Sequence, residues 1–200
     1  AVDLLGNIYI ADTNNHIIRK ISKGRITDIA GKPGTGGYSG DGGRANEALL
    51  NRPIGLALDS SGDLYIADTG NHRIRKIDIS EGIITTVAGS GKLPASSTTE
   101  EGIGDNLPPT MASLYYPHDV AIDAADNIYI ADSGNHRIRK VKKGINIITT
   151  IAGDGFMGYT GNGGNAASAR LNWPKGVAID FNGTVFISDT NNNVIRCLIP

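Results

Sequence analysis

The stretch Leu64–Ile77, "LYIADTGNHRIRKI", decides the fold, because the chain repeats it three more times in nearly the same letters. The other copies read "IYIADTNNHIIRKI" at 8–21, "IYIADSGNHRIRKV" at 128–141 and "VFISDTNNNVIRCL" at 185–198. Their shared aspartates, Asp12, Asp68, Asp132 and Asp189, are separated by 56, 64 and 57 residues. Self-similarity at such a period indicates a repeat architecture.

Each repeat unit predicts four short strands. In the second unit these are "IGLALD" at 54–59, "DLYIAD" at 63–68, "RIRKI" at 73–77 and "IITTVAG" at 83–89, all rich in β-branched and aromatic residues and bounded by turn residues. We expect the Gly and Asn of the "TGN" turns to supply positive φ. No ten-residue stretch has helical periodicity. The chain is therefore predicted to be all-β, a β-propeller of four-stranded antiparallel blades.

The motif "D-T/S-x-N-H-x-I-R" following "Y-I-A-D" resembles the NHL repeat. The connectors "GYSGDGGRANEALLNRP" at 37–53 and "GYTGNGGNAASARLNWP" at 158–174 resemble those of the long-repeat type found in bacterial and cell-surface NHL proteins. This resemblance implies a ring of about six blades and favours an extracellular or cell-surface location.

The chain is expected to form a single propeller region over 1–200, with two complete and two partial blades. The blade units are 1–31, 53–89, 117–153 and 174–200. The incomplete outer units indicate a piece of a longer chain, which we favour. A second copy that completes the ring, or self-association through open blade edges, remains the alternative.

The repeated polar block is interpreted as architecture rather than chemistry. The aspartates are expected to accept hydrogen bonds from turn amides, and Arg19, Arg75, Arg139 and Arg196 to be their partners. The histidine of three units is Asn193 in the fourth. Asparagine can replace a hydrogen-bonding imidazole but not a proton shuttle.

Composition excludes several classes of function. Nineteen basic and twenty acidic residues give a net charge of −1, so neither a nucleic acid nor an anionic membrane is expected as a partner. No apolar run is long enough to span a membrane. The single cysteine, Cys197, excludes an internal disulfide framework.

Residues that the repeats do not share are the candidates for function. The connectors and the "DTGNH" turns are predicted to crowd one face of the propeller. There His118 and Asp119 stand where the other units have Ile or Lys and Gly, and Tyr116, Trp173 and Lys175 lie at the same strand entrances. These five residues are the candidates for a binding rim. The alternative is that Trp173 packs beneath the glycine-rich loops and that His118 is a partly exposed histidine near Asp119 with no ligand.

Metal and phosphate sites are not expected. His118 resembles the zinc-ligand position of propeller lyases, but one histidine does not make a zinc site. Asp41 and Asp105 lack the further oxygens that calcium requires. The glycine-rich connectors lack the Gly-Lys-Ser/Thr of a phosphate loop. We predict no catalytic residue, metal or cofactor.

The leading functional hypothesis is a non-catalytic interaction or scaffold module that presents loops to a protein, peptide or glycan. One alternative is a structural subunit of a surface assembly joined through incomplete blades. Another is a metal-dependent lyase or hydrolase whose site other blades complete. The insertion at 90–105, which carries about seven extra residues, is either neutral or a contact loop, and Asn182 of the sequon "NGT" is a candidate glycosylation site.

Overall fold

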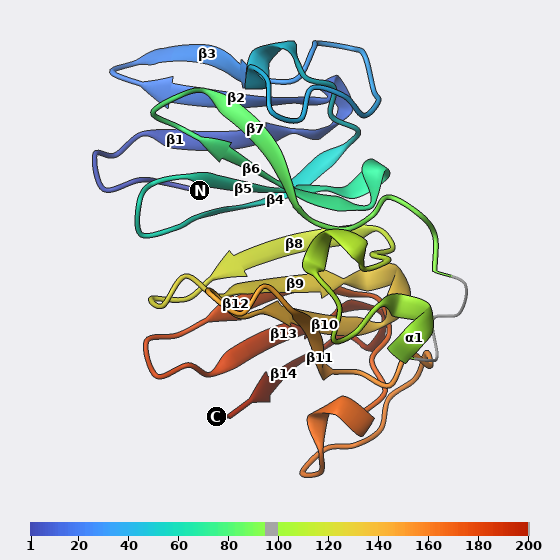
Figure 1. The fold of residues 1–200 in the computed structure, drawn as a ribbon. Helices are drawn as coiled ribbons and strands as arrows, with labels where there is room; N and C mark the ends of the chain where they lie inside the picture. The colour runs from blue at the N-terminus through green and yellow to red at the C-terminus, as the bar shows by residue number, and fades with distance from the viewer. Residues whose placement is uncertain (95–99, 200) are drawn as a thin grey trace.

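A computed structural model describes residues 1–94 and 100–199, and it places four antiparallel sheets one after another (Figure 1). The all-β prediction is confirmed, as is the division into two four-stranded and two three-stranded sheets within the described residues. The sheets comprise β1 (Ile8–Asp12), β2 (Ile17–Ser22) and β3 (Arg25–Ala30); β4 (Pro53–Leu58), β5 (Leu64–Asp68), β6 (Arg73–Asp78) and β7 (Ile83–Ala88); β8 (Pro117–Ile122), β9 (Ile128–Asp132), β10 (Arg137–Val141) and β11 (Ile148–Ala152); and β12 (Pro174–Ile179), β13 (Val185–Asp189) and β14 (Val194–Leu198).

Helical structure in the described residues is limited to short turns. The one α-helix, α1, spans Glu100–Ile103. A 3-10 turn joins the second and third strands of every unit, and each connector contains a further 3-10 turn. The turn in the connector before β4 is Ala45–Glu47.

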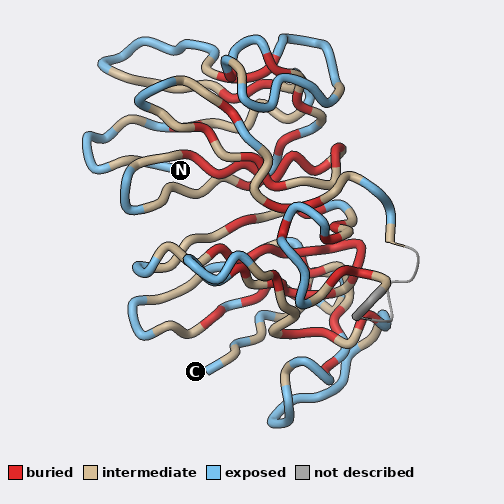
Figure 2. The backbone as a smooth tube through the Cα atoms, in the orientation of Figure 1, coloured by how far each residue is buried: buried red, intermediate tan, exposed pale blue. Residues whose placement is uncertain are grey.

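Apolar residues from neighbouring sheets and from the connectors form the core (Figure 2). Each connector contributes one leucine, Leu50, Leu114 or Leu171, whose side chain is at most 1% exposed. Burying one such side chain contributes about 1.5–3 kcal/mol. Each connector is therefore anchored in the interior by its leucine, and this fixes where its last residues lie.

The first strand of each complete blade lies next to its counterparts: β8 packs against both β4 and β12. The described parts of the connectors and the turns between second and third strands lie on one side of the molecule, at the right of Figure 1. We call this side the connector face. The described residues contain no helix long and apolar enough to cross a membrane.

Candidate functional site

Three of the repeated aspartates, Asp68, Asp132 and Asp189, each hold the connector that enters their own blade. Oδ1 of Asp132 accepts a hydrogen bond from the backbone N–H of Tyr115 at 2.8 Å, and Oδ1 of Asp68 accepts from that of Asn51 at 2.7 Å. The turn also donates an amide, as expected, but it is the side-chain amide of the turn asparagine, such as Asn135 Nδ2 to Asp132 at 2.8 Å, and not a backbone amide. The turn is a 3-10 turn closed by its own backbone, and its aspartate makes no capping bond.

The predicted arginine partners are confirmed in all four units. Arg139 is fully buried and lies 3.1 Å from Asp132 and 2.7 Å from Asp105 of the connector. Arg75 likewise lies 2.7 Å from Asp41. Asp41 and Asp105 are thus partners of guanidinium groups.

Burial determines the direction of the pKa shift at two buried aspartates of this network, Asp68 and Asp132. Desolvation raises the pKa of Asp132, although Arg139 opposes the shift. Desolvation likewise raises the pKa of Asp68 to about 6, against the hydrogen bonds from Asn71 and Asn51. These shifts have structural causes, and no substrate is needed to explain them.

The repeated histidine connects one blade to the next. Nδ1 of His16, His72 and His136 accepts the backbone N–H of Arg52, Tyr116 and Trp173 at 3.0, 3.1 and 3.2 Å, respectively. The histidines themselves have φ between 53° and 60°, and Asn193 has φ 56°. Histidine and asparagine are among the residues that tolerate this conformation.

The turn glycines have a different role from the one expected. Positive φ belongs to the histidine position, whereas Gly70 and Gly134 are needed for close approach. A Cβ at Gly134 would lie 2.5 Å from the ring and 2.7 Å from the carbonyl oxygen of Tyr115.

A hydroxyl completes each link between blades. Thr69 Oγ1 donates to the carbonyl oxygen of Pro117 at 2.7 Å, and Ser133 Oγ donates to that of Pro174 at 2.5 Å. We call the histidine and hydroxyl pair the inter-blade clasp. Each clasp fixes a residue with φ near 50° just before the proline of the next blade.

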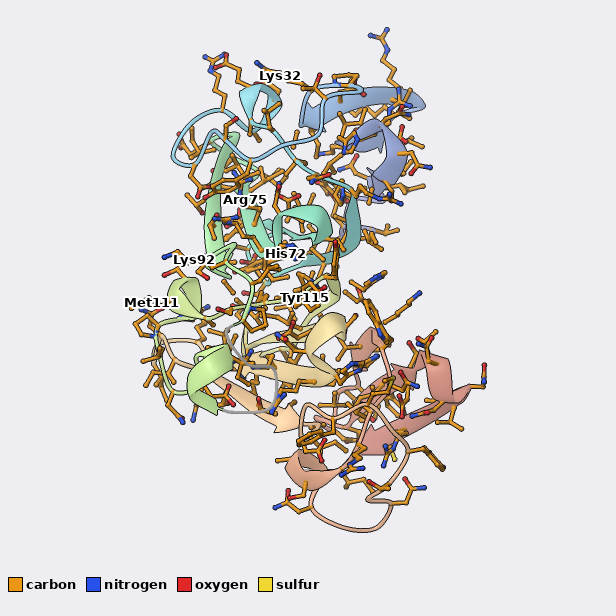
Figure 3. All side chains as sticks on the ribbon, turned by 90° about the vertical axis from the view of Figure 1, so that its right-hand side faces the viewer. Lys32, His72, Arg75, Lys92, Met111 and Tyr115 are labelled. Atoms are coloured by element: carbon orange, nitrogen blue, oxygen red, sulfur yellow. The ribbon has the colours of Figure 1, made fainter. Side chains whose placement is uncertain are left out.

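The fixed residues, Arg52, Tyr116 and Trp173, border a depression of about 380 Å³ on the connector face. Figure 3 looks onto this face, with His72 and Tyr115 near its centre. We call this hollow the rim depression. Its lining consists of Asn51, Arg52, Ile54, Thr69, Gly70, Tyr116, His118 and Trp173.

Aromatic rings form a continuous row beside and within the rim depression. The centroid of Tyr116 lies 4.7 Å from that of His72 and 6.5 Å from that of Trp173. Trp173 in turn lies 6.1 Å from His136 in an edge-on arrangement. Tyr116 remains 39% exposed, so its ring is available to a ligand.

The structure brings together three of the five predicted rim residues, Tyr116, His118 and Trp173. Lys175 is exposed and near enough to His118 to lower the pKa of that imidazole, although burial is the larger cause. Asp119 faces the neighbouring strand. Its Oδ2 accepts the backbone N–H of Val177 at 3.0 Å, which links β8 to β12.

The sequence reasoning missed Arg52 and Ile54. The signal was present, because Arg52 precedes Pro53 as Tyr116 and Trp173 precede their prolines. Among residues 1–94 and 100–199, no group of three or more His, Cys, Asp or Glu side chains is placed to hold a metal ion.

Two other candidates lie away from the rim depression. Asn182 is exposed in the turn between β12 and β13, and its backbone N–H donates to Asp180 at 2.9 Å. The insertion at 90–105 includes residues 95–99, which lie outside the described residues. The contact-loop hypothesis for that segment therefore stays a prediction.

Comparisons with known proteins agree with this architecture. The family model of the teneurin NHL domain matches residues 26–100, and that of the NHL repeat matches residues 114–141. Human Teneurin-1 is 30% identical over 212 residues, and Protein SUPPRESSOR OF QUENCHING 1, chloroplastic, of Arabidopsis thaliana is 27% identical over 249 residues. The chain belongs to the NHL-repeat β-propeller family.

These relatives are much longer proteins. The alignments cover 95% of this chain but 7% of Teneurin-1, and 94% of this chain but 23% of the Arabidopsis protein. The chain therefore spans less than a quarter of either relative.

Solved structures share the fold at lower sequence identity. An auxiliary nutrient binding protein from Bacteroides thetaiotaomicron superposes with a TM-score of 0.65 at 20% identity, covering 97% of this chain and 45% of that one. Virginiamycin B lyase from Staphylococcus aureus gives a TM-score of 0.56 at 15% identity, covering 100% and 54%. The same fold thus occurs in a binding protein and in an enzyme.

Proposed function

We propose that this region is a non-catalytic interaction module that binds a protein, peptide or glycan partner in the rim depression. The observation that carries the proposal is the position of the three clasped residues. The clasps use repeated side chains to hold three residues that differ from blade to blade: Arg52, Tyr116 and Trp173. A constant framework that displays variable side chains at one place is the arrangement of a binding surface.

The contents of the rim depression support binding. Exposed aromatic and aliphatic surface lies beside cationic groups, as in the anchor regions of protein interfaces. Ile54 is 37% exposed and Tyr116 is 39% exposed. The volume lies near the lower end of the range for small-ligand sites, so one or two side chains or a sugar unit would fill it.

A paired selection tests the proposal. The protein is screened against a random-peptide phage library and a glycan array, and the best binder is measured against two variants. Tyr116→Asn removes the ring but tolerates positive φ, and we expect it to weaken binding about tenfold. The control Phe181→Ser changes a side chain that is 96% exposed on the opposite face, and it should bind normally. Equal binding by both variants would place the ligand elsewhere.

A further inference from the structure

We propose that the rim depression recognises a carboxylate on a peptide ligand, next to an apolar side chain. This inference rests on the proposed function and names its ligand class. Two observations define the class: the neutral side chains of Thr69 and Asn51 are already hydrogen-bonded, whereas the cationic side chains of Arg52 and Lys175 have no partner in the described residues.

Two neutral polar side chains of the lining, Thr69 and Asn51, bond within the protein. The hydroxyl of Thr69 donates to Pro117, and the amide nitrogen of Asn51 donates to the carbonyl oxygen of Gly70 at 3.3 Å. Sugar recognition depends on amides, hydroxyls and carboxylates that are available to pair with ligand hydroxyls. The internal bonds of Thr69 and Asn51 leave these two groups less available to ligand hydroxyls, which disfavours a glycan relative to a peptide.

The cationic side chains at or beside the rim depression have no bonding partner among the described residues. Within the described part of the chain, neither Arg52 nor Lys175 forms an ion pair or a side-chain hydrogen bond, and both are exposed. The repeated arginines, by contrast, all pair with carboxylates, as Arg139 does with Asp132 and Asp105. No Asp or Glu lines the depression. An anionic ligand group would meet the unpaired Arg52 in the lining and the unpaired Lys175 near His118, and no carboxylate belongs to the lining itself.

The shape of the cationic group favours a carboxylate. A guanidinium presents a planar pair of donors that matches a carboxylate in bidentate geometry. Ile54, Tyr116 and Trp173 lie in the same lining, so the group next to the carboxylate would rest on apolar surface. Two cations suit a single anionic group better than a polyphosphate chain, and the net charge of −1 adds no long-range attraction for one.

Trp173 supplies a direct readout, because it is the only tryptophan in the chain. Its fluorescence is followed while the protein is titrated with two matched probes, Ac-Ala-Leu-Glu-NH2 and Ac-Ala-Leu-Gln-NH2. We expect the glutamate peptide to bind about fivefold more tightly, as an exposed ion pair allows. The preference should shrink as salt rises from about 0.05 to 0.5 M.

Variants show whether the preference arises in the rim depression. Arg52→Gln should reduce the ratio of the two dissociation constants to about one, and Lys175→Gln should reduce it in part. Lys32→Gln removes the same charge from an exposed lysine at the far end of the connector face in Figure 3, and it should leave the ratio unchanged. Circular dichroism confirms that each variant is folded.

The outcomes separate this inference from the proposed function. Equal affinity for the two probes would overturn the carboxylate preference while leaving a peptide site in place. No fluorescence response to either probe up to millimolar concentration would overturn both statements for peptides. Displacement of the glutamate peptide by oligouridylate, with a steep salt dependence, would overturn the inference in favour of a nucleic-acid phosphate.

Discussion

Replacing Asp132 by alanine is expected to unfold the protein at a much lower temperature. The change leaves Arg139 fully buried with only Asp105 as a charged partner, and it leaves the backbone N–H of Tyr115 without its acceptor. Removing one member of a buried ion pair costs about 3–5 kcal/mol. For a chain of this length each kcal/mol lowers the unfolding midpoint by about 2–4 °C, so the midpoint should fall by roughly 6–20 °C.

The same substitution at Asp12 is the matched control. The motif is the same, and both arginines keep a second carboxylate, but Arg19 is 36% exposed whereas Arg139 is fully buried. An exposed pair contributes about 0–1 kcal/mol, so Asp12→Ala should lower the midpoint by no more than about 4 °C. Urea denaturation and calorimetry measure both variants. Equal losses, or an Asp132→Ala variant that keeps its stability but loses ligand binding, would refute a structural role for the motif.

Three further predictions follow from the clasps and turns. Neutral His136 accepts the N–H of Trp173, and burial lowers its pKa. The hydrogen bond of neutral His136 therefore stabilises the fold fully above pH 6.5, and this stabilisation is lost as pH falls below that value. The thermal midpoint of the protein should decline between pH 7.5 and 5.5, and His136→Asn should make this decline smaller. An unchanged decline would contradict the argument. In Gly134→Ala the added Cβ would lie 2.5 and 2.7 Å from connector atoms, and the free energy of unfolding measured in urea should fall by about 1–3 kcal/mol. In Gly164→Ala the nearest atom to the added Cβ is 3.6 Å away, and the free energy of unfolding should not change measurably. Similar losses in the two variants would refute the close-approach argument. We propose that Asn182 carries a glycan after expression through a eukaryotic secretory pathway, which intact mass should show as an increment absent from an Asn182→Gln variant; an unmodified mass would exclude it.

The strands were predictable because each depends on local pattern. Residues 54–59 and 63–68 were expected as strands, and β4 and β5 occupy 53–58 and 64–68. Four copies of one pattern made the prediction far more secure than one copy would have been. The arginine partners were predictable for a similar reason, since a recurring acid and base in one short hairpin lie within reach of each other.

The clasp geometry was not predictable from one chain segment. His72 accepts its hydrogen bond from the backbone N–H of Tyr116, which is 44 residues further along the chain. A local sequence pattern therefore cannot predict the pair. The left-handed conformation of the histidine was hidden because glycine, the usual residue for positive φ, lies two positions earlier.

The site was predictable only in part. Tyr116, His118 and Trp173 stood out as residues that the repeats do not share, whereas Arg52 looked like an ordinary surface charge. Asp119 stood out equally, but its carboxylate faces the neighbouring strand. Gly55 and Gly176, which lie beside Asp119 on β4 and β12, have no side chain and leave room for the carboxylate there. Differences between the repeat units identify candidate positions for a site, but the direction of each side chain follows from packing in the folded structure.

Hydrogen exchange with and without the best binder from the peptide and glycan screens tests the central claim most directly. The claim is that the repeated motif builds the frame and that the residues it holds form the binding surface. We predict that ligand protects the backbone amides around Arg52, Tyr116 and Trp173 and leaves the opposite turns, such as 59–63 and 180–184, unchanged. Protection confined to those opposite turns would contradict the account. Protection of the turns between second and third strands, with none at Arg52, Tyr116 and Trp173, would contradict it as well.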